Sequence, residues 1–391
     1  MKFTVHKTVI VNALSTALGI VEKRSAFPIL SNILLSATED GQISITATDE
    51  ESQIKTNLKA KTVEEAGKTT APANKLSELC KLLPEGADIT IYLNNEKLFI
   101  ESGSGKYSIS TLPSEDFPIF RVDDSGEEVK LQAAALKNVI NKTFFAIDTT
   151  TSWERPYLKG LYLKIEDKNI IAVSTDAHRL ATTSSPIKKG LTDEASGIIP
   201  KKAVSEVGKL LSDLNGEVSI SLTDNIFRLD TSTSTFSTKL IAHKFPNYER
   251  TIPSGECDVL KVNTKMFTEV IRRVRVLSDH DAKPVLFEIK SNKVLVSTAG
   301  RNQEEAKESI NTKYDGDDIE IAFKSNYLQD IFTTIESEEC HISLFGTDQN
   351  CLITSPDDPN FKCILMPLLI TQTGPTETVG SDGDKGASGA A

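Results

Sequence analysis

The chain repeats one arrangement of hydrophobic and polar positions three times. In each repeat a proline precedes a run in which apolar and polar residues alternate, at 27–35, 155–163 and 283–290. The three prolines, Pro28, Pro156 and Pro284, are separated by 128 residues both times. Alternation with period 2 indicates strands, and a fixed spacing of whole motifs indicates internal repeats. The sequence therefore predicts three copies of one β-rich domain.

Each repeat also contains two stretches with the hydrophobic period of an α-helix. These windows are 7–24 and 74–83, 134–143 and 201–211, and 264–277 and 324–334. Alternating strand patterns precede and follow them. Few helices among many strands favour an α+β fold in which helices cover one face of antiparallel sheet. We predict three repeated domains of antiparallel sheet with two helices each.

Polar segments that contain Gly or Pro set the predicted domain bounds. The three domains are expected at 1–125, 126–253 and 254–370. The remaining stretch, 371–391, is rich in Gly, Ser, Thr and Asp, and Val379 is its one large apolar residue. Such a composition buries too little apolar surface to fold. We therefore predict a disordered tail at 371–391.

Composition narrows the class of protein. The 391 residues include five cysteines, an odd number without metal-ligand spacing, which predicts free thiols in a reducing cytoplasm and no metal or cofactor. A secretory signal is not visible, and no run approaches the ~18 apolar residues of a membrane span, so we expect a cytoplasmic protein without a membrane partner. The same features argue against an extracellular adhesion or scaffold module.

The charge distribution changes what the net charge of −11 implies. A negative net charge argues against binding to nucleic acid. The six helical windows, however, contain 15 Lys and Arg residues and only 5 Asp and Glu residues. The windows therefore carry +10 and the rest of the chain −21. Lys and Arg are good helix formers, but so is Glu, which is scarce there. Helices facing one way would form a basic surface that holds a polyanion through its phosphates, without reading bases.

The densest group of candidate catalytic or binding residues lies at 173–181. Asp176, His178 and Arg179 follow an apolar run directly, and residues i and i+2 of a strand point to one face. An enzyme that uses Asp176 and His178 as an acid–base pair is therefore one hypothesis. In another, Asp176 bonds backbone at a turn and His178 only packs. The Gly-containing segment 103–106 leads into a strand pattern, so it is not a phosphate-binding loop.

Several motifs, taken in order, resemble one known family. They lie at 1–5, 28–32, 82–87, 110–113, 116–118, 175–181, 245–248 and 366–367. Together they resemble the bacterial DNA polymerase III beta subunit, the sliding clamp. The resemblance implies a ring-shaped head-to-tail homodimer that encircles duplex DNA without sequence specificity, a processivity factor and not an enzyme. It also implies as partners the DNA polymerase III alpha subunit, the clamp-loader delta subunit and other motif-bearing replication and repair proteins.

The resemblance and the charge count assign residues to two surfaces. The family pattern places Arg24, Lys75, Lys201 and Lys202 on the DNA, and the charge count adds Lys137, Lys142, Arg272, Arg273 and Arg275. A dimer interface between the first domain and the third is implied at Lys75, Tyr107, Val276, Leu277, Arg301, Glu304, Glu305 and Glu308. An apolar pair with charged neighbours suits an interface core with a polar rim.

The resemblance also implies a groove that captures short peptides of partner proteins. Its expected residues are Leu158, Thr175, Ala177, His178, Arg179, Leu180, Pro246, Arg250, Thr251, Tyr327, Ile364, Leu365, Met366 and Pro367. Apolar side chains with a few polar groups suit an apolar peptide side chain, and a methionine adapts to different ligands. On this hypothesis the segment 173–181 binds the peptide of a partner protein. The chain departs from the family pattern after Pro367, where Leu368-Leu369-Ile370 follow in place of an early end with an arginine.

Overall fold

The computed structural model describes residues 1–22, 26–120, 126–278, 284–299 and 304–369. It separates into two compact units. Unit 1 comprises Met1–Val173 and Ser184–Phe245, and unit 2 comprises Ser174–Thr183 and Pro246–Ala391. The predicted tail at 371–391 and two predicted site residues, Arg24 and Arg301, lie outside the described residues.

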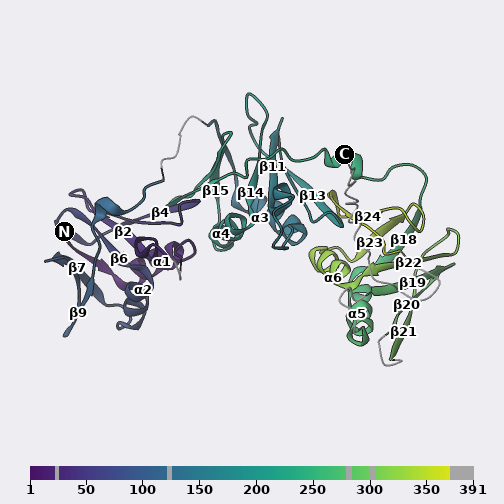
Figure 1. Ribbon diagram of the computed structural model, residues 1–391, viewed down its shortest axis with the longest axis horizontal. Coiled ribbons are helices and arrows are strands. Elements are labelled where there is room, and N and C mark those ends of the chain that lie inside the picture. The colour runs from purple at the N-terminus through teal and green to yellow at the C-terminus, as the bar shows by residue number, and fades with distance from the viewer. Residues whose placement is uncertain (23–25, 121–125, 279–283, 300–303, 370–391) are drawn as a thin grey trace, which may run out of the picture. The chain divides into compact units, whose positions relative to one another are not determined.

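The order of elements repeats three times along the chain (Figure 1). The first repeat is β1 Lys2–His6, α1 Lys7–Ala17, β2 Asn32–Ala37, β3 Gln42–Thr48, β4 Ser52–Lys59, β5 Thr62–Glu65, β6 Gly67–Pro72, α2 Ala73–Leu82, β7 Asp88–Asn94, β8 Lys97–Ser102 and β9 Gly105–Ser110. The second is β10 Glu128–Gln132, α3 Ala133–Thr143, β11 Gly160–Glu166, β12 Asn169–Thr175, β13 Arg179–Pro186, β14 Ala195–Pro200, α4 Lys201–Ser212, β15 Glu217–Leu222, β16 Ile226–Asp230 and β17 Ser234–Lys239. The third is β18 Asp258–Asn263, α5 Thr264–Val274, β19 Pro284–Lys290, β20 Lys293–Ala299, β21 Glu305–Asn311, β22 Ile319–Lys324, α6 Ser325–Thr334, β23 Glu339–Leu344, β24 Cys351–Ser355 and β25 Asp358–Leu365. The predicted α+β class is confirmed.

The helices lie where the hydrophobic period predicts them, and only α1 and α5 differ from their windows by more than one residue at an end. Helix α1 ends at Ala17, so the predicted window 7–24 is too long. Gly19, a poor helix former, follows the C-cap residue Leu18, and a Cβ there would lie 2.0 Å from the Glu206 Oε2. Helix α5 ends at Val274, and the rest of its window is the 3₁₀ helix η6, Arg275–Leu277.

Unit 1 contains the sheets of the first repeat and most of the second. Strands pair in the orders β5-β1-β7-β8-β9, β10-β15-β16-β17-β4-β3-β2-β6 and β14-β11-β12. The second of these sheets is continuous across two repeats, because β17 pairs with β4. Helix α1 packs on α2 and helix α3 on α4, and buried residues such as Leu14, Leu76, Leu136 and Val204 form the core beneath them.

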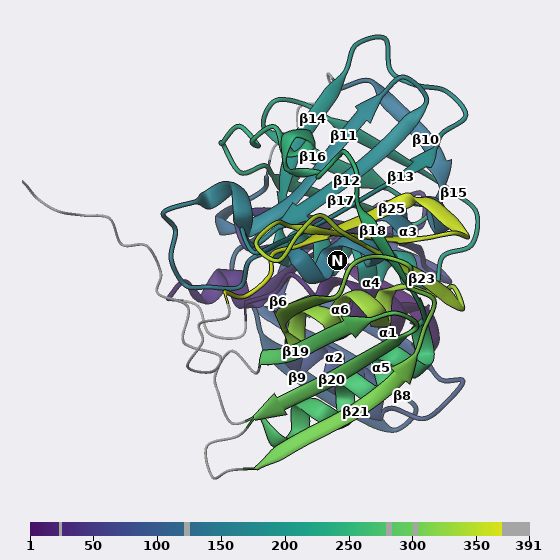
Figure 2. The same ribbon diagram turned by 90° about the vertical axis from the view of Figure 1, so that its right-hand side faces the viewer.

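Unit 2 contains the third repeat and the turn at Ser174–Thr183. Its strands pair in the orders β21-β20-β19-β22 and β13-β25-β24-β23-β18. Helix α5 packs on β20 and β21 (Figure 2), and helix α6 packs on α5 and on β22. Phe267 of α5 anchors them, since its ring centroid lies 5.0 Å from that of Phe332 on α6 and 5.5 Å from that of Phe287 on β19. This aromatic core fixes α6, which carries part of the site described below.

All five cysteines are free thiols, and four of them are buried. Burial raises the pKa of Cys80 and of Cys351 to about 12, and it also raises the pKa of Cys340 and Cys363. A thiol with so high a pKa is protonated at pH 8, and only the thiolate attacks a disulfide. The buried cysteines are therefore inert in the folded protein.

Titration with a chromogenic disulfide reagent at pH 8 checks this placement. Cys257, the one half-buried cysteine, is expected to react first. The four buried thiols are expected to react at least ~10³-fold more slowly, because burial raises the pKa of each, to about 12 for Cys80 and Cys351, and so depletes the reactive thiolate. Cys257→Ser is expected to abolish the fast phase, and all thiols react alike in denaturant. Two or more fast thiols in the native protein would contradict the packing.

Candidate peptide-binding surface

The turn between β12 and β13 is built by its own side chains. The Thr175 hydroxyl donates to the Arg179 carbonyl (2.7 Å) and accepts from the Ala177 amide (3.1 Å). The Asp176 Oδ1 accepts the amides of His178 and Arg179, each at 3.0 Å. Ala177 has a φ of 72°, a left-handed conformation that strains a residue with a Cβ. The hydrogen bonds on both sides hold Ala177 in that conformation.

This geometry corrects the acid–base hypothesis. Asp176 and His178 do not share the face of a strand, because β12 ends at Thr175 and β13 begins at Arg179. Both carboxylate oxygens of Asp176 already have partners: Oδ1 accepts two backbone amides and Oδ2 accepts the Arg179 Nε at 3.1 Å. Asp176 is a turn-forming residue, as the structural hypothesis expected.

Arg179 is the centre of the polar contacts. Its side chain is only 8% exposed, and its Nη1 donates to the Asp330 Oδ2 at 2.7 Å. Its guanidinium carbon also lies 4.3 Å from the centroid of the Tyr327 ring. Two carboxylates and an aromatic face therefore compensate one nearly buried cation. The result is a rigid link between the turn and α6.

Helix α6 contributes Tyr327 and Asp330 from one face, since residues three apart are neighbours on a helix. The His178 and Tyr327 rings lie 6.2 Å apart at 26°, and the Lys324 Nζ lies 5.2 Å from the Tyr327 ring. Sequence reasoning named Tyr327 but missed Asp330 and Lys324. The three-residue spacing puts Asp330 on the same helix face as Tyr327. That spacing points to Asp330 as a partner of Arg179 only once Arg179 is known to be buried and to need one.

The end of β25 supplies the apolar part of the surface. Arg179 and Leu180 pair with Leu365 and Ile364 across β13 and β25. One further backbone hydrogen bond continues this strand pairing: the Met366 amide donates to the His178 carbonyl at 3.0 Å. The Met366 side chain is 50% exposed, next to the strictly buried Leu365. The backbone of Met366 is thus fixed while its thioether faces solvent.

The structure divides the expected groove residues by burial. Arg179, Leu180, Ile364 and Leu365 are buried within unit 2, so they support the surface from below, whereas Leu158 is buried within unit 1. Thr175, Tyr327 and Pro367 are half-buried, and the exposed residues are Ala177, His178, Pro246, Arg250, Thr251 and Met366. All of them except Leu158 belong to unit 2.

Leu158 belongs to unit 1, in the 3₁₀ helix Pro156–Lys159. Its carbonyl accepts the Asp148 amide at 3.0 Å, and the adjacent Lys159 donates to the Asp148 Oδ2 at 2.6 Å. Burial acts to raise the pKa of Asp148, but hydrogen bonds from Lys159 and Thr150 outweigh it, so the pKa lies below its usual value. Asp148 is therefore ionised at neutral pH and anchors this helix.

The cations expected to contact DNA differ in their exposure and in their partners within the chain. Lys75, Lys202, Arg272 and Arg273 are exposed, and Lys137, Lys142, Lys201 and Arg275 are half-buried. Lys202 is ion-paired with Asp49, and Arg273 with Glu308. The Arg273 guanidinium holds the pKa of Glu308 below its usual value. Two expected phosphate contacts are thus ion-paired within the chain, while Lys137 donates to the Ser212 carbonyl (3.2 Å) and Arg275 to the Asn326 side chain. Glu308, the partner of Arg273, was itself assigned to the dimer interface.

The remaining residues of the expected interface are mostly exposed. Val276 is 74% exposed on η6 and Tyr107 is 41% exposed on β9. Leu277 is half-buried, and Glu304 and Glu305 are exposed. Val276 is therefore the most exposed apolar side chain among these residues.

Comparison with known proteins accounts for this architecture. Family models of the DNA polymerase III beta subunit match its N-terminal domain at residues 1–121, its central domain at 130–247 and its C-terminal domain at 249–369. The beta sliding clamp of Pseudomonas putida is 32% identical over 370 residues, 94% of this chain and 100% of the relative. That of Escherichia coli K12 is 30% identical, again over 94% and 100%. A crystal structure of a sliding clamp from Pseudomonas aeruginosa bound to griselimycin matches with a TM-score of 0.91 at 30% identity, covering 95% of this chain and 100% of that one.

The repeated fold and these matches define a sliding clamp as the class of protein. The chain belongs to the DNA polymerase III beta subunit family. Its relatives are processivity factors of DNA replication, and the enzyme hypothesis for Asp176 and His178 is not supported. Within the described residues, no group of three His, Cys, Asp or Glu side chains could hold a metal ion, and no helix there is long and apolar enough to cross a membrane.

Proposed function

We propose that two copies of this chain close head to tail into a ring around duplex DNA. The ring slides without reading sequence and tethers the replicative polymerase. The observation that carries this proposal is the threefold repetition of one α+β domain in a sliding-clamp chain, because head-to-tail contacts between repeated domains form a ring when their rotation closes. The same function requires no catalytic group, metal or cofactor. It operates on the chromosome, which places the protein in the cytoplasm.

The phosphates are held by cations on the helices. Lys75, Lys137, Lys142, Lys201, Arg272 and Arg275 are the side chains we assign to this contact, together with Arg24. Contacts of this kind act through charge and counterion release, so static binding to linear duplex is weak and falls steeply with salt. Arg273 can join them only by leaving Glu308.

The subunit interface joins Lys75 and Tyr107 of the first domain to Val276, Leu277 and the segment 301–308 of the third. Its apolar centre is Val276, which is 74% exposed in the single chain. An exposed valine on a fixed helix suits burial against a second copy, with the charged neighbours as the rim.

Native mass tests this interface directly. The wild-type protein is expected at twice the 42.7 kDa of one chain. Val276→Asp places a charge in the apolar centre and is expected to shift the protein to monomer at micromolar concentration, a loss of at least about 2 kcal/mol of association energy. Ile119→Asp, at a 62% exposed residue outside the proposed interface, serves as the matched control. A wild-type monomer at every concentration would contradict self-closure.

Partner peptides bind at the surface formed by His178, Tyr327 and Met366, with Arg179 and Leu180 beneath. Griselimycin, bound by the Pseudomonas aeruginosa clamp, is the probe we assign to the same surface. The exposed Met366 beside fixed polar groups supports this assignment, because such sites capture an apolar side chain and orient it through a few hydrogen bonds. The DNA polymerase III alpha subunit, the clamp-loader delta subunit and repair proteins share this surface in turn.

A further inference from the structure

The turn between β3 and β4 in the first repeat reproduces the β12–β13 turn bond for bond. The Thr48 hydroxyl donates to the Ser52 carbonyl (2.9 Å) and accepts the Glu50 amide (3.0 Å). The Asp49 Oδ1 accepts the amides of Glu51 (3.1 Å) and Ser52 (2.6 Å). Glu50 has a φ of 67°, the counterpart of Ala177 at 72°. The two turns differ in the partner of the second carboxylate oxygen.

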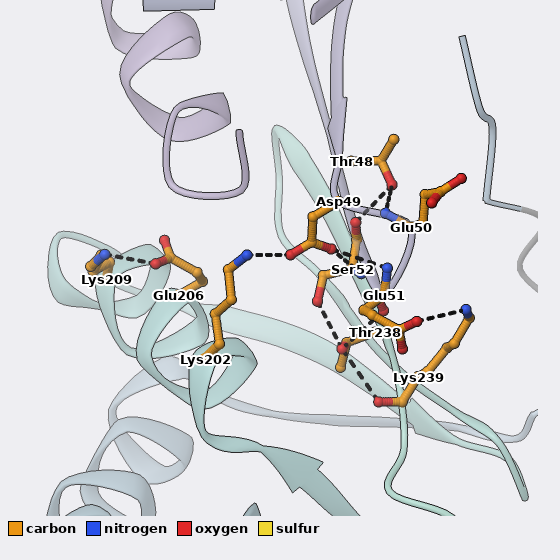
Figure 3. Close-up of polar contacts among 10 residues, drawn as sticks. All are labelled: Thr48, Asp49, Glu50, Glu51, Ser52, Lys202, Glu206, Lys209, Thr238 and Lys239. Atoms are coloured by element: carbon orange, nitrogen blue, oxygen red, sulfur yellow. Dashed lines mark hydrogen bonds and ion pairs between the residues drawn. The ribbon is translucent and has the colours of Figure 1, made fainter. Parts of the chain in front are cut away.

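In the first repeat that oxygen accepts the ammonium of Lys202. Figure 3 shows Lys202 extending from α4 to the Asp49 Oδ2, across a sequence separation of 153 residues. In the β12–β13 turn the corresponding oxygen accepts Arg179, which is part of the turn itself. The first turn has Ser52 at that position, so it contains no cation of its own. The helix supplies the cation instead.

Burial makes this cation necessary. The Asp49 side chain is 5% exposed, whereas that of Lys202 is 54% exposed. An ionised carboxylate so far from water is costly unless it is paired and hydrogen-bonded. Two backbone amides satisfy Oδ1, and Lys202 is the partner of Oδ2.

The pair lies beside the seam that joins the first repeat to the second. Across β4 and β17, the hydroxyls of Ser52 and Thr238 lie 2.9 Å apart and those of Thr56 and Ser234 lie 3.0 Å apart. At the end of the seam the Lys239 ammonium lies 3.1 Å from the Glu51 Oε1 (Figure 3). The seam joins the strands of the two repeats into one sheet, and the Lys202–Asp49 pair connects the β3–β4 turn at its end to α4.

We propose that Lys202 is a positioning residue, which neutralises the buried Asp49 and fixes the β3–β4 turn against α4. Its role is thereby distinguished from that of Lys201, which precedes it on the helix and remains assigned to DNA. At α6 the charges are the other way round: the turn supplies the cation, Arg179, and the helix supplies the carboxylate, Asp330. This assignment concerns the fold and stands independently of the proposed DNA binding.

Hydrogen exchange of the backbone amides at 49–52 tests the proposal in the full-length protein. Lys202→Met is expected to accelerate exchange there about tenfold, because it leaves a buried carboxylate oxygen without its cation. Lys202→Arg keeps the charge and is expected to restore slow exchange. Asp49→Asn keeps an acceptor for the two amides and removes the charge. In that background Lys202→Met is therefore expected to have no further effect.

Lys201→Met is the matched control, expected to leave exchange at 49–52 unchanged. Strands β19–β22 in unit 2 provide the internal reference for global unfolding. The proposal is overturned by unchanged exchange in Lys202→Met, or by an equal acceleration of exchange in the Asp49→Asn background. If Lys202→Met does not fold, the double variant decides: we expect it to fold, and its failure to fold would equally overturn the proposal.

Discussion

Replacing Arg179 with methionine is expected to destabilise unit 2 by about 2–3 kcal/mol and to weaken griselimycin binding at least tenfold. The side chain is 8% exposed and bonds both Asp176 and Asp330. Methionine keeps the apolar stem but leaves Asp176, itself 12% exposed, without its cation. Hydrogen bonds to charged groups contribute about 1.5–3 kcal/mol each, and removing one partner exposes the cost of the other. The turn and the Tyr327 ring then lose their common support.

Chemical unfolding and a binding titration measure the two effects separately. Arg155→Met replaces an exposed arginine of unit 1 and is expected to change neither. Asp330→Asn removes the charge on the helix side of the link. Because the Asp330 side chain is 45% exposed, it is expected to cost less than Arg179→Met. A fully stable Arg179→Met protein that still binds griselimycin would show that the arginine does not organise the surface.

Truncation at Met366 and at Leu180 is expected to separate binding from folding. Met366 is 50% exposed, so Met366→Ala is expected to weaken griselimycin binding at least tenfold while stability changes by less than about 0.5 kcal/mol. Leu180 is 6% exposed and belongs to the core, so Leu180→Ala is expected to cost about 2–4 kcal/mol of stability. Its effect on binding follows from disturbed packing.

Leu369→Ala is the matched control, since that side chain is 75% exposed and lies just past the surface. It is expected to leave both affinity and stability at the wild-type level. The reverse pattern, with Met366→Ala neutral and Leu369→Ala defective in binding, would move the contact surface beyond Pro367.

The repeats and element types follow from the sequence because they depend on local periodicity. A period of 2 after Pro28 and Pro156 predicts β2 and β11, and the helical windows predict all six α-helices that the described residues contain. Helix ends are less determined. Gly19 ends α1 early, in a place where the apolar pattern alone continues to Ile20 and Val21.

Contacts between distant residues could not be read from the sequence. The Lys202–Asp49 pair spans 153 residues and the Arg179–Asp330 bond spans 151, and a helical charge count cannot distinguish a paired lysine from an open one. Burial was equally hidden: Arg179 looks like a surface residue by type but is 8% exposed. The candidate peptide surface was therefore predicted by resemblance, and the contacts that support it became visible only in the folded structure.

We propose that the protein holds DNA by encircling it. The most direct measurement is retention of the protein, loaded by a clamp loader onto a nicked circular plasmid, before and after one cut linearises the circle. The protein is expected to stay on the circle in moderate salt and to leave within minutes of linearisation, because a ring slides off a free end. Equal loss from circular and linear DNA would contradict encirclement.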